Sequence, residues 1–583
     1  MGQRAPESRP WQPPPPPVAP PLWMALLVAA GLFALLLSNG RPIGAGDTRP
    51  TERVAASLAQ QGNLDVDEYP EVEPPFARQE GAHRVSIYPV LSAVMAAPVF
   101  AVAKAFFALD ETGMALAGKV AASLFSALAA GVLFLCVGRR LTVADAWRTA
   151  AVFALGTSVW STSQALWQHP AAVLFLQAAV LLAMKAEQDP AWAGRAGLPL
   201  ALAVAARHAD VAAAGVLAVA IALRWPRQIR GLFLWGLPGG GFVLLYQWLY
   251  FGSPWRHGFA GSLGRFSEPW GVGHAGLLVS PAKGLLVFTP VAAVAVAGLL
   301  RAFRRGERWL AGTLGLAALA HFALMGRWSE WHGGESWGPR LMTDALPLLF
   351  VFLPDGIEMA PLLGSLLVAV SVAVQALGAF GYDYRWERQY QRPPDPGRPE
   401  LWRLETSPIP FYAGTRLALP SIPAVRAGRA IVREHPIVLF GPTGSRVSFA
   451  GERLAVTGAD ATFGDVHLQA AARLDGDKLR LTGRWDGLFL RVLPGARIRR
   501  LELRIAGRGR GTLYVGERSF WSDAPHWTAY AINGGFRLRH PYDYATSGGP
   551  DLVVTLGKSE GAAALDSVGL VPPGEPENVI EAP

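Results

Sequence analysis

Long apolar segments recur through the first 380 residues of the chain, and they constrain its fold more than any other feature. The clearest covers residues 113–137 and contains a single charged side chain. A helix of about 20 apolar residues is long enough to cross the hydrocarbon core of a membrane. This segment ends at Gly138-Arg139-Arg140, where the chain becomes polar again. The pattern predicts a membrane protein with many spanning helices.

The composition agrees with this prediction. Hydrophobic residues make up 51% of the chain and charged residues only 17%, against about 25% charged residues in an average soluble protein. The net charge is +9. Arginines at cytoplasmic helix ends account for such an excess, so the charge does not call for a nucleic acid partner. The one cysteine, Cys136, excludes an intramolecular disulfide.

The fold class expected is a polytopic α-helical membrane protein with about eleven spans. These are predicted at residues 23–38, 113–137, 147–165, 170–185, 197–207, 209–224, 231–250, 284–301, 309–326, 341–353 and 360–380. Residues 197–224 are read as two short helices, because one continuous helix would bury Arg207, His208 and Asp210 at mid-membrane, which is costly. Two crossings here also place most short-loop arginines and lysines on one side, the cytoplasmic one.

The expected location is therefore the inner (plasma) membrane, with multiple passes. The Pro-rich tail at residues 1–22 would be disordered and cytoplasmic, and the C-terminal part would be extracytoplasmic or periplasmic. For residues 23–38 the alternative is a cleaved signal peptide. Residues 381–415 are expected to form a linker. Residues 416–583 contain short alternating runs separated by Gly, Asp and Pro, which predict an all-β, sandwich-like domain.

The first outer loop, residues 39–112, holds most of the acidic candidates. Asp47 lies just outside the first span and could act as a general base toward an acceptor hydroxyl. Asp65, Asp67 and Glu68 form a tight cluster that could bind a divalent cation or substrate hydroxyls. The alternatives are a helix cap for Asp47 and ordinary solvated carboxylates for the cluster. Residues 50–61 have the spacing of a short amphipathic helix on the membrane surface.

Other outer segments carry aromatic, basic and polar candidates for substrate contact: Tyr88, Trp167, Gln168, His169, Arg207, Arg256, His257, Lys283, Trp331, His332, Glu335, Trp337 and Arg340. The tryptophans could stack on sugar rings, and Arg340 could hold a phosphate oxygen through two N–H groups. The competing interpretation is that they are interfacial aromatic anchors and snorkelling arginines.

Taken together, these motifs resemble the GT-C class of membrane glycosyltransferases, in its protein-mannosyltransferase and aminoarabinose-transferase branch. The resemblance covers about residues 22–380. It rests on the order of Gly46-Asp47-Thr48, ASLAQQGNLDVDEYP, Ser86-Ile87-Tyr88-Pro89, Leu166-Trp167-Gln168-His169, the junction at Arg207, SPAKGLLVFTP at 280–290 and GESWGPRLMTDALP at 334–347.

The resemblance implies that Asp47 is the catalytic aspartate and that the donor is a sugar on a polyprenyl phosphate. It also implies that Arg340, Lys283 and Arg207 hold the lipid phosphate. Two positions depart from the family pattern: Thr48 follows Asp47 where several relatives have a second acidic residue, and His208 stands where a proline is common. They leave the second carboxylate and any metal requirement undecided.

The function expected is therefore a membrane glycosyltransferase. It would move a sugar from a polyprenyl-phosphate donor to an extracytoplasmic glycan, lipid or protein. Its partners would be that donor, membrane lipid and the acceptor, with no nucleic acid. Trp521, Trp527, Tyr530 and Tyr542 in the β domain could bind glycan. The alternatives are a non-catalytic glycan-binding scaffold and a transporter or flippase for lipid-linked sugars, whose polar residues would lie near the midplane.

Overall fold

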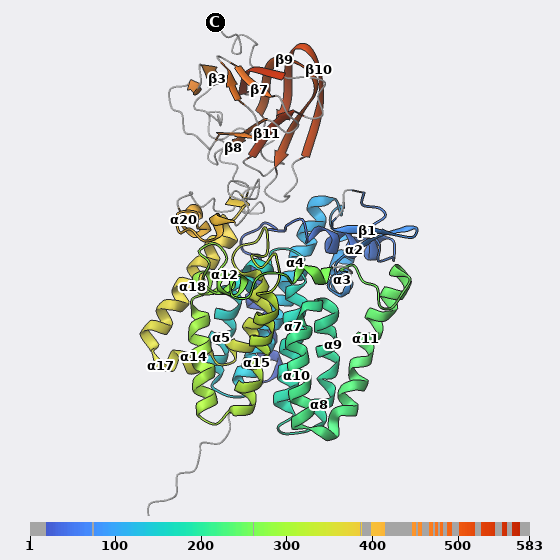
Figure 1. The fold of residues 1–583 in the computed structure, drawn as a ribbon, viewed down its shortest axis with the longest axis vertical. Coiled ribbons are helices and arrows are strands. Elements are labelled where there is room, and N and C mark those ends of the chain that lie inside the picture. Colours follow the sequence, from blue (N-terminus) through green and yellow to red (C-terminus); the bar gives the residue numbers. More distant parts are fainter. Residues whose placement is uncertain are drawn as a thin grey trace, which may run out of the picture. The chain divides into compact units, whose positions relative to one another are not determined.

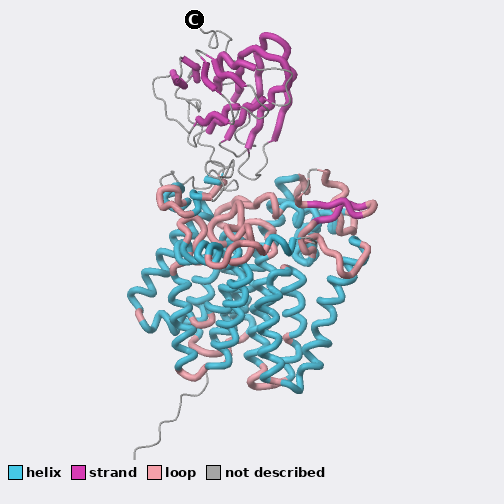
Figure 2. The backbone as a smooth tube through the Cα atoms, in the orientation of Figure 1, coloured by secondary structure: helices cyan, strands magenta, loops and turns pink. Residues whose placement is uncertain are grey.

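The computed structural model describes residues 19–70, 72, 75–259, 262–384, 386–387 and 398–413, together with ten strands between residues 446 and 571. The chain divides into a helical unit, which ends at residue 417, and a second unit of mainly β structure. The second unit comprises residues 418–583 and two short segments, 40–43 and 110–116. Helices dominate the first unit and strands the second (Figure 2).

The main helices of the first unit follow the apolar segments of the sequence. They are α1 (Leu22–Leu37), α4 (Glu111–Gly138), α5 (Val143–Leu155), α7 (His169–Lys185), α9 (Gly197–Ala206), α10 (Val211–Arg224), α11 (Ile229–Phe251), α14 (Val291–Arg304), α15 (Arg308–Met325) and α18 (Pro361–Gly381). In Figure 1, α7, α9, α10, α11, α14 and α15 run side by side.

Within the described part of the chain, four helices are long and apolar enough to cross a membrane: Glu111–Gly138, Pro226–Phe251, Arg308–Met325 and Pro361–Gly381. Shorter apolar helices cover Leu22–Leu37, Leu91–Lys104, His169–Lys185 and Ala191–Ala206. Several apolar helices of membrane-spanning length are thus confirmed. The number eleven and the orientation of the two termini stay predictions.

The predicted break at residues 207–210 is present. Helix α9 ends at Ala206, Arg207 has an extended backbone, and a short 3-10 turn, η1 (His208–Asp210), leads into α10. The three ionisable side chains therefore lie at a junction between two helices, where backbone groups and neighbouring charges can pair with them.

Three predicted spans are interrupted. Residues 147–165 divide into α5 and α6 (Ser158–Thr162) after Gly156. Residues 284–301 divide into α13 (Leu285–Phe288) and α14, with Pro290 between them. Residues 341–353 form η4 (Arg340–Ala345) and α16 (Leu346–Phe350), followed by α17 (Leu353–Met359). Proline has no N–H to continue a helix and favours its first turn, and both α16 and α17 have a proline there.

The first loop folds into a compact layer at one end of the bundle (Figure 1). It contains α2 (Arg49–Gln60), the antiparallel hairpin β1 (Ala77–Glu80) and β2 (His83–Ser86), and α3 (Leu91–Lys104). The helix predicted at residues 50–61 is thus confirmed as α2. Most of its first two turns are buried, and it packs against α3.

The segment predicted as a linker, residues 381–415, is instead part of the helical unit in its described positions. Tyr382, Trp386 and Tyr412 are almost completely buried. The Ser280 hydroxyl donates to the Leu401 carbonyl at 2.5 Å. The prolines and arginines suggest a flexible connector, but the aromatic residues between them pack against the helices.

The β unit is built from antiparallel strands. They are β3 (Arg446–Ala450), β4 (Arg453–Thr457), β5 (Val466–Gln469), β6 (Arg473–Asp475), β7 (Lys478–Leu481), β8 (Gly487–Arg491), β9 (Leu501–Arg518), β10 (His526–Tyr542), β11 (Asp551–Leu556) and β12 (Ala563–Val571). The order is β4-β3-β12-β9-β11-β8-β5, with β10 beside β9 and β7 between β12 and β6.

Not all strands are as short as the alternating runs of the sequence suggest: β9 includes the glycine-rich stretch at its centre, which stays extended and pairs with β10. The sandwich itself stays a prediction. Of the four aromatic glycan candidates, Trp521 lies outside the described residues, as do the side chains of Trp527 and Tyr542. The Tyr530 hydroxyl lies 2.7 Å from Nδ1 of His540.

Candidate active site

Asp47 lies in a tight turn between the end of α1 and the start of α2. The Thr48 hydroxyl donates to the carbonyl of Ala45 at 2.9 Å and fixes the turn. Glycines flank it because the space is small: a Cβ on Gly44 would meet the Thr48 hydroxyl at 2.6 Å, and one on Gly46 would meet the ring of Phe76 at 2.9 Å. The Asp47 carboxylate is thereby held in one place at the edge of the first loop.

Asp47 forms an ion pair with Arg340. Oδ2 of Asp47 lies 2.6 Å from Nη2 of Arg340, and the two side chains are only 17% and 15% exposed. The other carboxylate oxygen, Oδ1, is buried and accepts no hydrogen bond from the described residues. One oxygen is thus neutralised by a cation, and the second is available as a hydrogen-bond acceptor.

Two further contacts fix the Arg340 guanidinium. Nε donates to the Gly333 carbonyl at 2.6 Å. The guanidinium carbon lies 4.1 Å from the centre of the Trp167 ring, which is a cation–π geometry. Gly333 has a φ of +74°, and a Cβ there would come within 3.0 Å of the Arg340 side chain. Glycine is therefore required for the loop to curl around the arginine.

The Asp47 carboxylate is largely shielded from water, and this changes its pKa. Burial raises the pKa of the Asp47 carboxyl above its ordinary value, and the charge of Glu335 adds to the rise. Arg340 opposes this rise without cancelling it. Carboxylates with raised pKa values are typical of acid–base catalysis. Asp47, Trp167, Glu335 and Arg340, four of the predicted residues, thus act on one another.

Lys283 is placed differently from the prediction. Its ammonium is completely buried and donates to the carbonyls of Gly334, at 2.9 Å, and Ser336, at 2.5 Å. It also pairs with Glu387 at 3.3 Å. These three partners match the three donors of an ammonium. Lys283 thus ties down the loop that carries Arg340, and its protein partners leave no donor for a lipid phosphate.

The aromatic side chains of the 327–340 loop are also engaged by protein. Trp331 is 4% exposed and packs against Trp402. Trp337 is 2% exposed, and its indole N–H donates to the Val374 carbonyl at 3.1 Å. His332 is buried beside Glu330, with Nε2 2.8 Å from the carboxylate, and burial lowers its pKa to about 4. In this structure these residues shape the loop.

A buried charge network surrounds the α9–α10 junction. Oδ2 of Asp344 lies 2.8 Å from both Nδ1 of His169 and Nη1 of Arg207. Arg207 also reaches Asp210 at 3.3 Å. His321 lies 3.3 Å from Asp210. The network joins η1, α7, α15 and η4, so His169 and Arg207 hold helices together rather than projecting into open space.

Sequence reasoning did not select Asp344 or Glu387. A charged residue within the apolar run 341–353 is a signal for Asp344, because such residues are expensive in a membrane and need partners. Glu387 lies among other charged residues in a polar stretch. No sequence signal distinguishes it.

The acidic cluster of the first loop is a separate feature. Oδ1 of Asp67 accepts from the Arg84 amide at 2.6 Å, and Oδ2 lies 2.8 Å from the His83 ring. Glu68 accepts from the Ser57 hydroxyl at 3.1 Å. Ligand atoms of Asp65, Asp67 and His83 lie within 4.8 Å of one another and could hold a metal ion, as could those of Asp210, His321 and Asp344. The second group already contacts Arg207.

The remaining predicted residues lie around these features. Arg256 pairs with Glu80 of the hairpin at 3.0 Å. Tyr88 packs edge-on against Phe259, with ring centres 5.5 Å apart. His257 lies beside His208. Gln168 precedes α7 and makes no side-chain cap.

No family model matches the chain, and no curated protein matches it. It is similar to a solved structure. That structure is the crystal structure of ArnT from Cupriavidus metallidurans bound to undecaprenyl phosphate, with 14% sequence identity and a TM-score of 0.40. The match covers 71% of this chain and 82% of the other.

Proposed function

We propose that this protein is a membrane glycosyltransferase that moves a sugar from a polyprenyl-phosphate donor to a hydroxyl group of an acceptor outside the cytoplasm. The observation that carries the proposal is how the two carboxylate oxygens of Asp47 are paired. One oxygen pairs with Arg340, and the other is buried without a hydrogen-bond donor among the described residues. The unpaired oxygen of such a carboxylate can accept a hydrogen bond from one hydroxyl.

In the proposed reaction, the acceptor hydroxyl donates its hydrogen to Oδ1 of Asp47. Its oxygen attacks the anomeric carbon of the donor sugar, and the proton moves to the carboxylate. The bond between that carbon and the phosphate oxygen breaks, and its electron pair stays on the phosphate. A positioned base of this kind typically contributes about 10²–10⁴-fold to a rate.

Arg340 would stabilise the departing phosphate. A guanidinium has five N–H donors in a planar fork, and the contacts to Gly333 and Asp47 are made through Nε and Nη2. A phosphate that binds the guanidinium would weaken its hold on Asp47. Because Arg340 lowers the pKa of that carboxyl, the donor would make Asp47 a stronger base as it binds.

The polyprenyl tail needs an apolar path, and the helical unit contains one. A groove of about 620 Å³ lies between α10 and α15. Its lining is mostly small and apolar, with Ala212, Val216 and Leu316 among its residues, and includes the polar side chains of Arg308 and Thr313. The first lining residue on α10, Ala212, lies two positions after Asp210. We assign the isoprenoid chain to this groove.

The proposal is tested with the full-length protein in lipid nanodiscs. Radiolabelled polyprenyl-phosphate sugars are supplied with cell-envelope extract as acceptor, and release of polyprenyl phosphate is measured. Wild type is expected to release it and Asp47→Asn to lose at least a hundredfold in rate. Asp145→Asn, the same change at the start of α5, serves as the control. Release that is equal in wild type and Asp47→Asn would remove Asp47 as the base. Movement of the intact lipid-linked sugar across the bilayer without release would support a transporter.

A further inference from the structure

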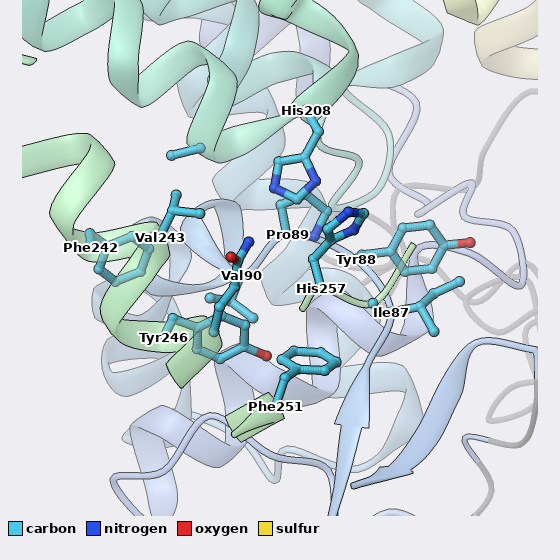
Figure 3. A pocket seen from close by; sticks show the side chains of 13 residues that line it. Ile87, Tyr88, Pro89, Val90, His208, Phe242, Val243, Tyr246, Phe251 and His257 are labelled. Atoms are coloured by element: carbon cyan, nitrogen blue, oxygen red, sulfur yellow. The ribbon is translucent and has the colours of Figure 1, made fainter. Parts of the chain in front are cut away.

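A small, partly open cavity lies beside the first loop. It has a volume of about 20 Å³ and is lined by residues 87–90, the end of α9, η1, the outer part of α11 and residues 257–258. Figure 3 shows Tyr246, Phe251 and His257 bordering the same space, with His208 and Tyr88 on either side of His257. A cavity of this size accommodates a group about as large as one water molecule.

Two polar atoms at this cavity have no hydrogen-bond partner among the described residues. They are the hydroxyl of Tyr246 and Nδ1 of His257, and both atoms are buried. Tyr246 as a whole is only 8% exposed. Buried polar groups are nearly always paired, because an unpaired one loses its hydrogen bonds to water without replacement. The cavity therefore suits a group that brings its own hydrogen-bond donor and acceptor.

The lining also indicates which kind of group would fit. Of the thirteen residues around the cavity that the structure describes, none is Asp, Glu, Lys or Arg. A phosphate, carboxylate or ammonium would lose its hydration there without a counter-charge, which is strongly unfavourable. Aromatic rings of Tyr88, Phe242 and Phe251 supply part of the remaining surface, and most of the rest is aliphatic. Neutral hydroxyl groups on an apolar carbon frame, as in a sugar, match this combination.

Tyr88 both lines the cavity and interacts with the charges of the candidate active site. The ring of Tyr88 lines the cavity. Burial and then the charge of Asp47 raise the pKa of the Tyr88 hydroxyl, and Arg340 acts on it in the opposite direction. The Tyr88 hydroxyl thus interacts electrostatically with both members of the Asp47–Arg340 ion pair. A sugar at Asp47 could extend one substituent past Tyr88.

The wall of the cavity is held in place from outside. Arg256, next to His257, pairs with Glu80 at 3.0 Å. The side chain of Arg78 donates to the Gly258 carbonyl at 3.2 Å. A Cβ on Gly258 would lie 2.1 Å from the Ile87 carbonyl oxygen, so only glycine allows this close approach. His257 is therefore anchored rather than free to swing away.

We propose that this cavity is a sugar subsite, in which Tyr246 and His257 bind one hydroxyl or hydroxymethyl group of a neutral sugar. The inference rests on the proposed function for the place of the sugar, which is either the donor sugar or a sugar of the acceptor. In both cases the Tyr246 hydroxyl and Nδ1 of His257 contact the group directly. A sugar that carries the group therefore binds more tightly than one that lacks it.

The test measures binding to the full-length protein in lipid nanodiscs. The probes are undecaprenyl phosphate, undecaprenyl-phosphate mannose and glucose, and the methyl glycosides of the same sugars. The variant Tyr246→Phe removes only the hydroxyl, and His257→Asn is a second, independent change. Tyr250→Phe is the matched control, because it lies on the same helix and its hydroxyl accepts from the Leu64 amide at 2.8 Å.

Tyr246→Phe and His257→Asn are expected to weaken a sugar-bearing probe about tenfold, which corresponds to about 1.4 kcal/mol, and to leave plain undecaprenyl phosphate unchanged. A loss confined to the lipid-linked sugars assigns the cavity to the donor, and a loss confined to the methyl glycosides assigns it to the acceptor. Equal binding in wild type and both variants would overturn the subsite. It would also be overturned if wild type bound no methyl glycoside and bound the lipid-linked sugars no better than undecaprenyl phosphate. This experiment measures only binding, and transfer is measured by the release assay. A protein that binds sugar in the first and transfers none in the second would refute the proposed function and leave the subsite standing.

Discussion

Oδ2 of Asp47 and Nη2 of Arg340 lie 2.6 Å apart, although the two residues are far apart in the sequence. The first belongs to the turn before α2 and the second begins η4. The pair therefore closes the candidate active site only when the first loop and the 327–340 loop are both folded. The interactions of Lys283, Trp331 and Trp337 hold the second of these loops.

Replacing Arg340 tests the role of the guanidinium. Arg340→Lys keeps the charge but loses the planar fork and the stacking on Trp167. We expect kcat/KM for a polyprenyl-phosphate sugar to fall by about 10²–10³, the cost typical of losing one donor that stabilises charge in a transition state. Arg340→Gln should be worse.

Initial rates over a range of donor concentrations measure this effect. Arg148→Lys, on an exposed part of α5, is the control. Unchanged kcat/KM in both Arg340 variants would show that the arginine does not contact the phosphate.

The pH dependence of the reaction should report on Asp47. A base works only when it is deprotonated, so activity is lost as the pH falls through its pKa. Burial raises that pKa above 3.8, so the acid limb of kcat/KM should lie above this value. The charge of Glu335 also raises it, and Glu335→Gln should therefore move the limb to lower pH.

The pH–rate profiles of wild type and Glu335→Gln are compared directly. A shift of the limb to higher pH in the variant would contradict this electrostatic account. Asp47→Asn should remove the limb together with most of the activity.

The sequence predicts the helices of the helical unit well. Burying a charged side chain in a membrane is costly, so membrane helices need long runs without charged residues, and such runs can be read directly from the sequence. Apolar runs such as 113–137 and 231–250 became α4 and α11. Hydropathy averages over a window, however, and does not register where a helix is interrupted. The break of 341–353 at its prolines and the change of helix after Gly156 depend on backbone geometry instead.

Sequence reasoning named Asp47 and Arg340 as candidate site residues, and their roles stay predictions. It did not foresee that the two side chains pair with each other. Their ion pair depends on how distant loops fold together, which no spacing encodes. Lys283 shows the opposite case: a cation at the outer end of a helix resembles a phosphate ligand, but its partner Glu387 lies a hundred residues farther along the chain.

The Lys283–Glu387 pair should contribute to stability rather than to binding. Lys283→Met leaves a buried carboxylate without its cation, and breaking such a pair typically costs about 3–5 kcal/mol. Lys283→Met combined with Glu387→Gln removes both charges and keeps an oxygen that can accept from the Tyr382 hydroxyl. We expect the double variant to recover most of the loss.

Thermal and denaturant unfolding in detergent micelles measure the two variants. In the double variant, affinity for undecaprenyl phosphate should match wild type. A stable double variant with strongly reduced affinity would instead place Lys283 at the phosphate.

The hairpin of the first loop should be stabilised by the His83–Asp67 pair over a limited pH range. The hydrogen bond that His83 donates to Asp67 raises the pKa of His83 above 6.5. This contribution is fully present below pH 6.5 and is lost as the pH rises through the raised value. Hydrogen bonds from the Arg84 amide and His83 hold the pKa of Asp67 below 3.8 despite its partial burial. That contribution is present above pH 3.8 and is lost as the pH falls through the lowered value.

The loop should therefore resist proteolysis best between about pH 4 and 6.5, the interval between the two ordinary pKa values. Limited digestion with a protease that cleaves across this range, followed by mass spectrometry of cuts within residues 77–86, measures the effect. Asp67→Asn should make the loop more susceptible and remove most of the change with pH above 6.5. His208→Asn, a histidine outside the hairpin, is the control. A loop that becomes more resistant as the pH rises from 6 to 8 would show that the protonated His83 does not stabilise it.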